Sequence, residues 1–452
     1  MRRLFLLLIV LLAALSAAFS QTTKAFPSAA DISTPPAAQT RPLDVKAAVD
    51  AYLALVPAEA RARSNSYFEG GYWFILWNFL FGAVVALALL NTTFSARMRD
   101  SAERITRFRF LQTFFYWIEY LLLISLVGLP LTIYEGFFRE RQYGLMNQSF
   151  GDWLRQQMIG LVVGALLGGL LVTALFGIVR RLPRTWWIWG SAVSVVFLVI
   201  SILIGPVFIS PLFNKYTKLK DERVRQPILA LARANGIPAT DVWEVDASRQ
   251  SNRVSANVSG FLGTERITLN DNLLRRCSLE EIAPVMGHEM GHYALNHIFK
   301  DILFFTLEAL LFFGFLRWSL EWTLARWGAK WQIRGIGDTA VLPLVMLLAS
   351  VFGFVMTPVN NSWTRAQEYE ADLFGINASR QPDGEAKVDL MLGEYRKLDP
   401  SPLEEIIFFD HPSGRTRITA AMRYKAEHMD DLQNAPSAGS APAAQPAPQP
   451  AP

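Results

Sequence analysis

The sequence predicts a polytopic α-helical membrane protein that also carries a polar α+β part. Of the 452 residues, 52% are hydrophobic and only 18% are charged, and the mean hydropathy is +0.23. Soluble globular proteins carry about 25% charged residues, so this chain is too apolar to be one. Its 43 basic and 39 acidic residues are too balanced for a nucleic-acid-binding protein. The single cysteine, Cys277, excludes an intrachain disulfide framework and a cysteine-based zinc cluster.

The N-terminus has the pattern of a secretory signal peptide. Arginines precede an apolar run from Leu4 to Leu15, and small residues follow it. Residues 1–20 are therefore interpreted as a signal peptide or, alternatively, as an uncleaved anchor helix. Within residues 21–70 we expect a flexible Ala/Pro-rich linker and then an amphipathic helix, Asp44 to Arg63, that lies at the membrane surface.

Six segments are long and apolar enough to cross a bilayer core of about 30 Å. The predicted spans are Tyr72–Leu90, Leu111–Tyr134, Met158–Val179, Trp186–Ile209, Ile298–Leu320 and Ala340–Pro358. They form two groups, four spans within residues 71–209 and two within residues 298–358. Polar residues interrupt or flank the last two spans, so their ends are less well defined.

The charges of the loops predict the orientation. The loops after the first, third and fifth spans lie on one side of the membrane and are rich in arginine. Their basic residues are Arg97, Arg99, Arg104, Arg107, Arg109, Arg180, Arg181, Arg184, Arg326, Lys330 and Arg334. By the positive-inside rule these loops are cytoplasmic, so the polar segments 210–297 and 359–432 face outward. An exported N-terminus gives the same orientation.

The polar segment 210–297 is predicted to contain both helices and strands. Asp221 to Asn235 has the apolar spacing of an amphipathic helix. Val242–Val245 and Arg266–Leu269 are typical of short strands.

A second helix in this segment opens with a capping box formed by Ser278 and Glu281. Pro284 lies inside this helix, where it removes a backbone donor, and the sequence does not explain why it is tolerated.

This helix is predicted to bind a metal. His288 and His292 are four residues apart, so both imidazoles lie on one face and can reach one cation. Glu289 lies beside them, which completes the H-E-x-x-H pattern of zinc proteases, two ligands and a general base. Three of the chain's five histidines crowd this helix, which argues against ordinary surface histidines. The third, His297, should lie on the opposite face and support the site.

A catalytic zinc needs a third protein ligand and an open position for water. Beyond the last span, Glu368 and Asp372 share one helical face, so one can bind metal while the other accepts the N–H of a ligating histidine. Glu370 points to a different face. Spacing alone leaves the choice among these acids open, and a solvated acidic helix face is the alternative.

These segments resemble motifs of the CAAX prenyl protease 1 family, which are integral-membrane zinc endopeptidases. His288-Glu-Met-Gly-His-Tyr-Ala-Leu-Asn-His297 is similar to the family's active-site helix. Thr364 to Asp372 resembles its S-R-x-x-E-[FY]-x-A-D segment, and Pro206 to Thr217 resembles its proline-rich stretch after a span. His411-Pro412 and Arg417 match its H-P-x-x-x-x-R-[IL] segment. The similarity runs from about Leu111 to Arg417.

The resemblance implies a zincin-like metalloprotease domain divided between residues 210–297 and 359–432, with one Zn²⁺ per chain. It also implies roles for seven residues. His288, His292 and Glu368 would be the metal ligands, and Glu289 the catalytic acid/base. Asp372 would support a metal ligand without binding the metal itself, and His411 with Arg417 would stabilise the oxyanion.

Two features depart from the family pattern. The family's S-N-A-[YF] on the substrate-pairing strand appears here as Ser255-Ala256-Asn257-Val258, so the contacts that anchor a peptide would differ. The family is usually drawn with seven spans and a cytosolic zinc, whereas six spans and the arginine distribution place the site outside here.

We therefore predict a zinc-dependent metalloendopeptidase that cleaves membrane-associated or lipidated proteins or peptides. The signal-like N-terminus, the Arg/Ala-rich composition and the single cysteine suggest a bacterial inner membrane, with a role in processing or quality control. The alternatives are a zinc-binding scaffold without turnover, which leaves Glu289 without a purpose, or an ion or solute transporter. A transporter would use Glu119 and Glu308, which lie within spans and are expected to face a water-filled interior. The Ala/Pro tail, residues 433–452, is expected to be disordered.

Overall fold

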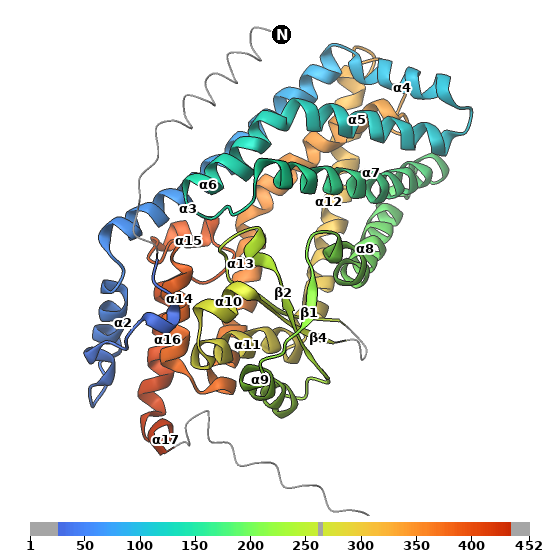
Figure 1. The fold of residues 1–452 in the computed structure, drawn as a ribbon. Helices are drawn as coiled ribbons and strands as arrows, with labels where there is room; N and C mark the ends of the chain where they lie inside the picture. The colour runs from blue at the N-terminus through green and yellow to red at the C-terminus, as the bar shows by residue number, and fades with distance from the viewer. Residues whose placement is uncertain (1–25, 261–264, 435–452) are drawn as a thin grey trace, which may run out of the picture.

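The computed structural model describes residues 26–260 and 265–434. Long helices form an elongated bundle, and a compact part with a small sheet lies at one end of it (Figure 1). The predicted signal peptide or anchor, residues 1–20, lies outside the described residues. So does all but the start of the predicted tail, because the last described helix, α17, is Met429–Asn434.

Five helical segments in the described part of the chain are apolar and long enough to cross a membrane. They are Ala58–Asn91, Arg109–Gln142, Phe150–Arg181, Trp186–Leu212 and Thr339–Ser379. Their helices are α3 (Ala58–Asn91), α5 (Arg109–Ile133), α7 (Phe150–Arg181), α8 (Trp186–Ile204) and α13 (Leu342–Ser379). The chain is therefore a multi-pass membrane protein.

The remaining expected span, Ile298–Leu320, lies within α12 (His297–Trp327), which is not one of these five. At about 1.5 Å per residue, its 31 residues are nevertheless long enough to cross a bilayer. It packs along α8 and α13. The two carboxylates expected within spans both have hydrogen-bond donors, Ser101 for Glu119 and Asn360 for Glu308.

The compact part contains a four-stranded sheet with the order β1-β2-β4-β3. The strands are β1 (Tyr216–Lys218), β2 (Val242–Val245), β3 (Ala256–Ser259) and β4 (Arg266–Asn270). The two strands predicted from sequence pattern, β2 and β4, are parallel neighbours, with Val242 opposite Ile267. β3 is antiparallel to β4 and forms an edge of the sheet.

Short helices surround this sheet, and the predicted amphipathic helix 221–235 is α9 (Glu222–Ala234), which the Asp221 side chain caps. The others in this part are α10 (Asp271–Arg276), α11 (Leu279–Ala294), α14 (Pro382–Leu392), α15 (Pro402–Phe408) and α16 (Gly414–Glu427). Ile228 of α9, Ile267 and Leu269 of β4, and Met286 and Met290 of α11 form the centre of the core beneath the sheet.

The prediction for the N-terminal segment was wrong in two respects. Residues 26–42 are packed against the body of the protein, with Ala29 and Ala38 fully buried, and do not form a flexible linker. The next helix, α2 (Val45–Ala54), buries Tyr52 and its neighbours against α16 rather than in a membrane surface. Apolar periodicity identifies a face that must be covered, but it does not say whether protein or lipid covers it.

Candidate active site

The candidate site lies where α11 crosses α13, and two glycines let these helices touch at their backbones. A β-carbon on Gly287 would lie 2.8 Å from the Gly375 Cα, and one on Gly375 would lie 2.7 Å from the His288 nitrogen. This close approach brings the histidines of α11 opposite the acids of α13. The sequence reading passed over both glycines, although Gly287 and Gly291 form a small-xxx-small pattern typical of close helix pairs.

The capping box predicted for α11 is confirmed, because Ser278 and Glu281 cap each other's backbone groups. Pro284 is buried within this helix. A proline there leaves the carbonyl of Glu280 without its helical donor. That carbonyl faces Gly384 of α14, where an added β-carbon would lie only 2.1 Å from the oxygen. The neighbouring helix therefore packs against the site of the missing hydrogen bond.

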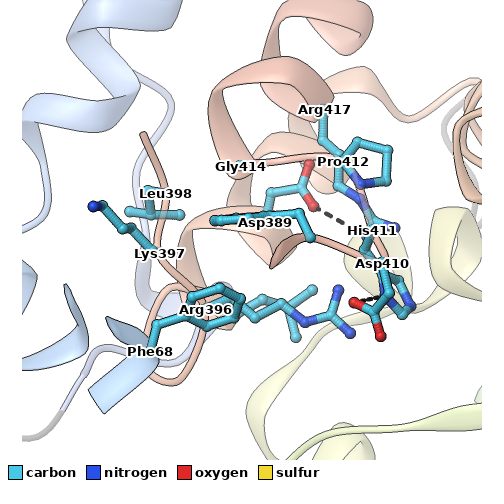
Figure 2. A pocket seen from close by; sticks show the side chains of 12 residues that line it. Phe68, Asp389, Arg396, Lys397, Leu398, Asp410, His411, Pro412, Gly414 and Arg417 are labelled. Carbon is cyan, nitrogen blue, oxygen red and sulfur yellow. Dashed lines mark hydrogen bonds and ion pairs between the residues drawn. The ribbon is translucent and has the colours of Figure 1, made fainter. Parts of the chain in front are cut away.

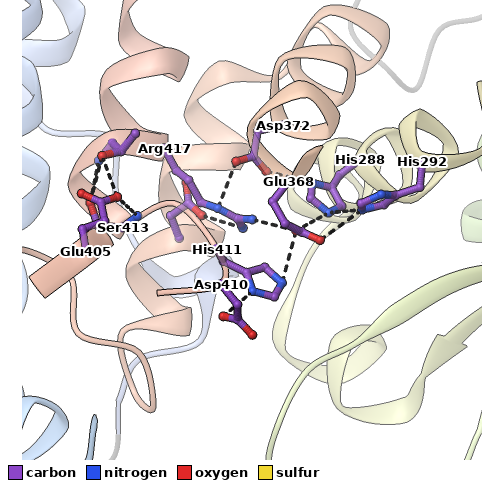
Figure 3. A network of polar contacts seen from close by, with 11 residues as sticks. His288, His292, Glu368, Asp372, Glu405, Asp410, His411, Ser413 and Arg417 are labelled. Atoms are coloured by element: carbon purple, nitrogen blue, oxygen red, sulfur yellow. Dashed lines mark hydrogen bonds and ion pairs between the residues drawn. The ribbon is translucent and has the colours of Figure 1, made fainter. Parts of the chain in front are cut away.

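Three side chains converge on one point between α11 and α13 (Figure 3). His288 Nε2 lies 3.1 Å from His292 Nε2 and 3.2 Å from Glu368 Oε2, and His292 Nε2 lies 3.4 Å from Glu368 Oε1. Tetrahedral zinc with ligand bonds of about 2.0–2.1 Å requires ligand atoms about 3.3 Å apart. The three donors therefore fit a zinc ion in number, type and spacing.

Further groups orient the two imidazoles. Asp372 Oδ1 lies 2.8 Å from His288 Nδ1, so this carboxylate can accept the Nδ1–H and leave Nε2 for a metal. His292 Nδ1 lies 2.8 Å from His297 Nδ1, and His297 Nε2 lies 3.1 Å from Glu370 Oε2. Each ring nitrogen that faces away from the convergence point thus has a partner.

The expectation that His297 lies on the opposite face was wrong, because it assumed an unbroken helix. α11 ends at Ala294, and Asn296 adopts a left-handed conformation with φ 56°. The chain turns there, and His297 begins α12 beside His292. Its expected supporting position agrees with this contact.

The site attracts positive charge. Burial opposes protonation of His288, but hydrogen bonds to the Asp372 and Glu368 carboxylates raise its pKa to about 10. Burial and the neighbouring charge of His288 lower the pKa of His292 to about 4, so this imidazole keeps its lone pair at neutral pH. The raised pKa of His288 reflects carboxylates that favour a positive charge here, and a divalent cation would supply that charge as well.

Glu289 lies in the same cavity as His288 but faces no partner. Among the described residues, its carboxylate has neither a hydrogen bond nor an ion pair. Burial raises its pKa to about 7, against a smaller lowering by His288. Its carboxylate is therefore suited to accept and return a proton near neutral pH.

His411 and Arg417 both reach Glu368 from the C-terminal part of the chain. His411 Nε2 lies 3.2 Å from Glu368 Oε2, and its Nδ1 lies 2.8 Å from Asp410 Oδ1. Arg417 Nη2 lies 3.4 Å from the same Glu368 oxygen. His411 is partly exposed to the cavity, whereas Arg417 is buried.

Arg417 is surrounded by carboxylates on several helices. Its Nε lies 3.1 Å from Asp372 Oδ2, and its Nη1 lies 3.6 Å from Asp389 Oδ1. Asp389 and the neighbouring Glu385 are buried acids of α14 that the sequence reading did not single out. They lie outside any motif, so only the packing of α14 on α11 and α16 shows their connection to the site.

An open cavity of about 140 Å³ gives access to these groups. His288, Glu289 and Glu368 line one side, and Val254 to Ala256, at the start of β3, line another. In the described sheet, β3 pairs only with β4, so its second edge has no strand partner. A free strand edge beside a metal site can pair with an extended peptide.

Comparisons with known proteins cover nearly the whole described chain. Residues 218–425 match Peptidase family M48, and residues 41–215 match the CAAX prenyl protease N-terminal family, described as five membrane helices. The uncharacterized metalloprotease YhfN of Bacillus subtilis is 32% identical over 367 residues, which cover 79% of this chain and 84% of that protein. CAAX prenyl protease 1 of Saccharomyces cerevisiae is 28% identical over 323 residues, 66% of this chain and 69% of that protein.

A solved structure shows the same fold. The crystal structure of S. mikatae Ste24p matches with a TM-score of 0.71 and 23% sequence identity. The match covers 81% of this chain and 90% of that chain, so it includes both the membrane helices and the compact part.

Proposed function

Because the chain belongs to peptidase family M48 and is a membrane metalloprotease of the CAAX prenyl protease 1 type, we propose that it binds one Zn²⁺ through His288, His292 and Glu368. The observation that carries this proposal is the convergence of three ligand atoms within 4.8 Å of one another. A bound zinc supplies Lewis acidity, which polarises a peptide carbonyl and lowers the pKa of water.

Glu289 is the proposed general base and acid. Its carboxylate takes a proton from the attacking water and later passes it to the leaving amine. The absence of any partner among the described residues leaves it available for both steps, and its pKa of about 7 suits them at neutral pH.

His411 is the proposed oxyanion donor. Asp410 holds its Nδ1, so Nε2 points toward the ligand cluster, where negative charge develops during peptide hydrolysis. One such donor is worth about 3 kcal/mol of transition-state stabilisation in other hydrolases. Arg417 contacts Glu368, Asp372 and Asp389, so its proposed role is to hold these carboxylates in position. A contact with the oxyanion is its second proposed role.

The proposed substrates are membrane-associated or lipidated proteins and peptides. The free edge of β3 offers main-chain hydrogen bonds to an extended peptide, which bind without strong selection of side chains. The helix α13 is a candidate membrane span and also contains Glu368, so the site lies close to the bilayer. Substrates at the membrane can therefore reach it readily. The name of the yeast relative, CAAX prenyl protease 1, refers to prenylated proteins. We propose prenylated proteins as one class of lipidated substrate for this chain.

We propose that the site faces outward from a bacterial inner membrane, with processing or quality control as its role. The three arginine-rich loops meet at the end of the bundle far from α11 (Figure 1). Arg99 contacts Asp338 at 2.7 Å, and Arg334 contacts Glu103 at 2.6 Å. The membrane parts are then 71–209 and 298–358, and the metalloprotease parts are 210–297 and 359–432.

The test is zinc content and peptide cleavage by the detergent-purified protein. We expect near one zinc per chain in the wild type. Glu289→Ala should keep the metal and lose cleavage, whereas Glu368→Ala should lose most of both. Normal cleavage by Glu289→Ala, or a wild-type protein that binds no zinc, would overturn the proposal.

A further inference from the structure

Arg396 lines the active-site cavity without a partner of its own. It borders the cavity that contains Glu289 and His411 and also the smaller space next to it, of about 30 Å³. Within residues 26–260 and 265–434, its guanidinium forms no hydrogen bond, ion pair or aromatic contact. Figure 2 shows the side chain extending between Phe68 and the Asp410–His411 pair.

The other arginines near this cavity are paired. Arg417 contacts three carboxylates, and Arg276 Nη1 lies 2.8 Å from Glu394 Oε2. Arg253 Nη2 lies 2.6 Å from Glu140 Oε2. A half-buried guanidinium that lacks such a partner has lost part of its hydration without a compensating ion pair. Arg396 is therefore the one cation among these four that remains available to a ligand.

The segment around Arg396 is fixed by its neighbours. Lys397 Nζ lies 2.7 Å from Glu69 Oε1 and 2.8 Å from Glu404 Oε1. Ser64 of α3 donates a hydrogen bond of 3.1 Å to the Arg396 carbonyl oxygen. The two adjacent cations thus differ in their contacts. Lys397 forms ion pairs that fix this segment, whereas the Arg396 side chain points into the cavity.

Two of the acids that line these spaces, Asp410 and Asp389, already have partners. Asp410 Oδ1 lies 2.8 Å from His411 Nδ1, and Asp389 Oδ1 lies 3.6 Å from Arg417 Nη1. Neither forms an ion pair with Arg396. Asp389 and Asp410 therefore act on this guanidinium only through their charge. No carboxylate among the described residues forms an ion pair with it, and the open cavity is where one can enter.

We propose that Arg396 binds a carboxylate group of the substrate peptide and so determines substrate preference. This rests on the proposed peptidase function of the cavity. A guanidinium presents a planar pair of N–H donors that match the two oxygens of a carboxylate. The carboxylate is either the C-terminus of the peptide or an Asp or Glu side chain near the scissile bond.

The test compares cleavage of matched anionic and neutral peptides by zinc-loaded, detergent-purified protein. One pair differs only in a C-terminal acid or amide. A scan places Glu or Gln at each position on both sides of the scissile bond in C-terminally amidated peptides. The measured quantity is the ratio of kcat/KM for the anionic peptide to kcat/KM for its neutral partner.

We expect the wild type to prefer one anionic peptide by about tenfold or more, the usual effect of one charge-assisted hydrogen bond. Arg396→Gln should abolish that ratio, and Arg396→Lys should retain part of it. The matched control is Arg423→Gln, because Arg423 is an exposed arginine of α16 and should keep the wild-type ratio. Zinc content of each variant verifies that the site has folded.

The pair that shows the preference identifies the source of the carboxylate. A ratio that survives Arg396→Gln, or no anionic preference at any position, would overturn the assignment. If the wild type cleaves none of the peptides, the proposed peptidase function fails instead, which is a separate result.

Discussion

Gly375 of α13 packs against the backbone of His288 on α11, and any side chain there would meet the His288 nitrogen at 2.7 Å. We predict that Gly375→Ala forces the helices apart and destabilises the protein by about 1–3 kcal/mol, as overpacking does. Zinc affinity should fall with it, since the proposed ligands lie on both helices. Gly353→Ala is the matched control, because a β-carbon at that position of α13 meets nothing within 4 Å. Thermal unfolding and zinc titration measure both effects, and equal behaviour of the two variants would contradict the argument.

Asp372 should matter more for metal binding than Glu370. Asp372 contacts the proposed ligand His288 directly, whereas Glu370 contacts His297, which in turn contacts His292. Loss of a group that orients a metal ligand costs about 10–100-fold in metal affinity. Asp372→Ala should show this loss in a competition titration with a chelator, and Glu370→Gln should show a smaller one. The reverse order would mean that His292, rather than His288, depends on its support.

His411 should affect turnover and not metal content. Removal of one oxyanion donor lowers kcat by about 10²–10³ in other hydrolases. We expect His411→Ala to keep zinc and to reduce kcat by a similar factor, with Asp410→Asn causing a smaller loss. Zinc analysis and steady-state kinetics separate the two quantities. If His411→Ala lost its zinc, the role of His411 would be to hold Glu368.

An ion-paired cluster links the membrane helices to the cavity wall. Arg253 Nη2 lies 2.6 Å from Glu140 Oε2 and donates a hydrogen bond to the Tyr67 hydroxyl of α3. Val254, the next residue, lines the cavity. We predict that Arg253→Met raises KM and lowers the unfolding temperature, and that Glu140→Gln added to it causes little further change. Two effects that simply add would show that the pair is not coupled.

The orientation can be tested with introduced cysteines, because the native Cys277 is buried. Arg104, in an arginine-rich loop, and Lys220, in the compact part, are both exposed. In intact spheroplasts a membrane-impermeant thiol reagent should label Lys220→Cys but not Arg104→Cys. After permeabilisation it should label both. The opposite pattern would place the metal site in the cytoplasm.

Local spacing was sufficient to predict the parts of the site that lie on one helix. His288 and His292 had to share a face, and so did Glu368 and Asp372, whatever the rest of the chain does. Which acid faces the histidines depends on how α11 crosses α13, and spacing left that choice open. The resemblance, not the pattern, selected Glu368.

Tertiary packing accounts for what the sequence reading missed. The turn at Asn296 brings His297 back beside His292, and no helical periodicity predicts such a reversal. Asp389 and Glu385 surround Arg417 from a helix that carries no motif. The apolar face of α2 has the pattern of a membrane-surface helix, yet α16 covers it.

α13 runs as one helix from Leu342 to Ser379, with Pro358 inside it, so the segment that crosses the membrane and the proposed metal ligand Glu368 belong to the same helix. Glu368 lies about 39 Å along this helix from Leu342, at 1.5 Å per residue. A tilt of the whole helix by about 5° at Leu342 would move Glu368 through about 3 Å. This is several times the tolerance of about 0.5 Å for the positions of catalytic groups. The spans packed around α13 therefore have to hold this helix in one orientation. The thickness of the lipid around them becomes a determinant of whether the third ligand is in place.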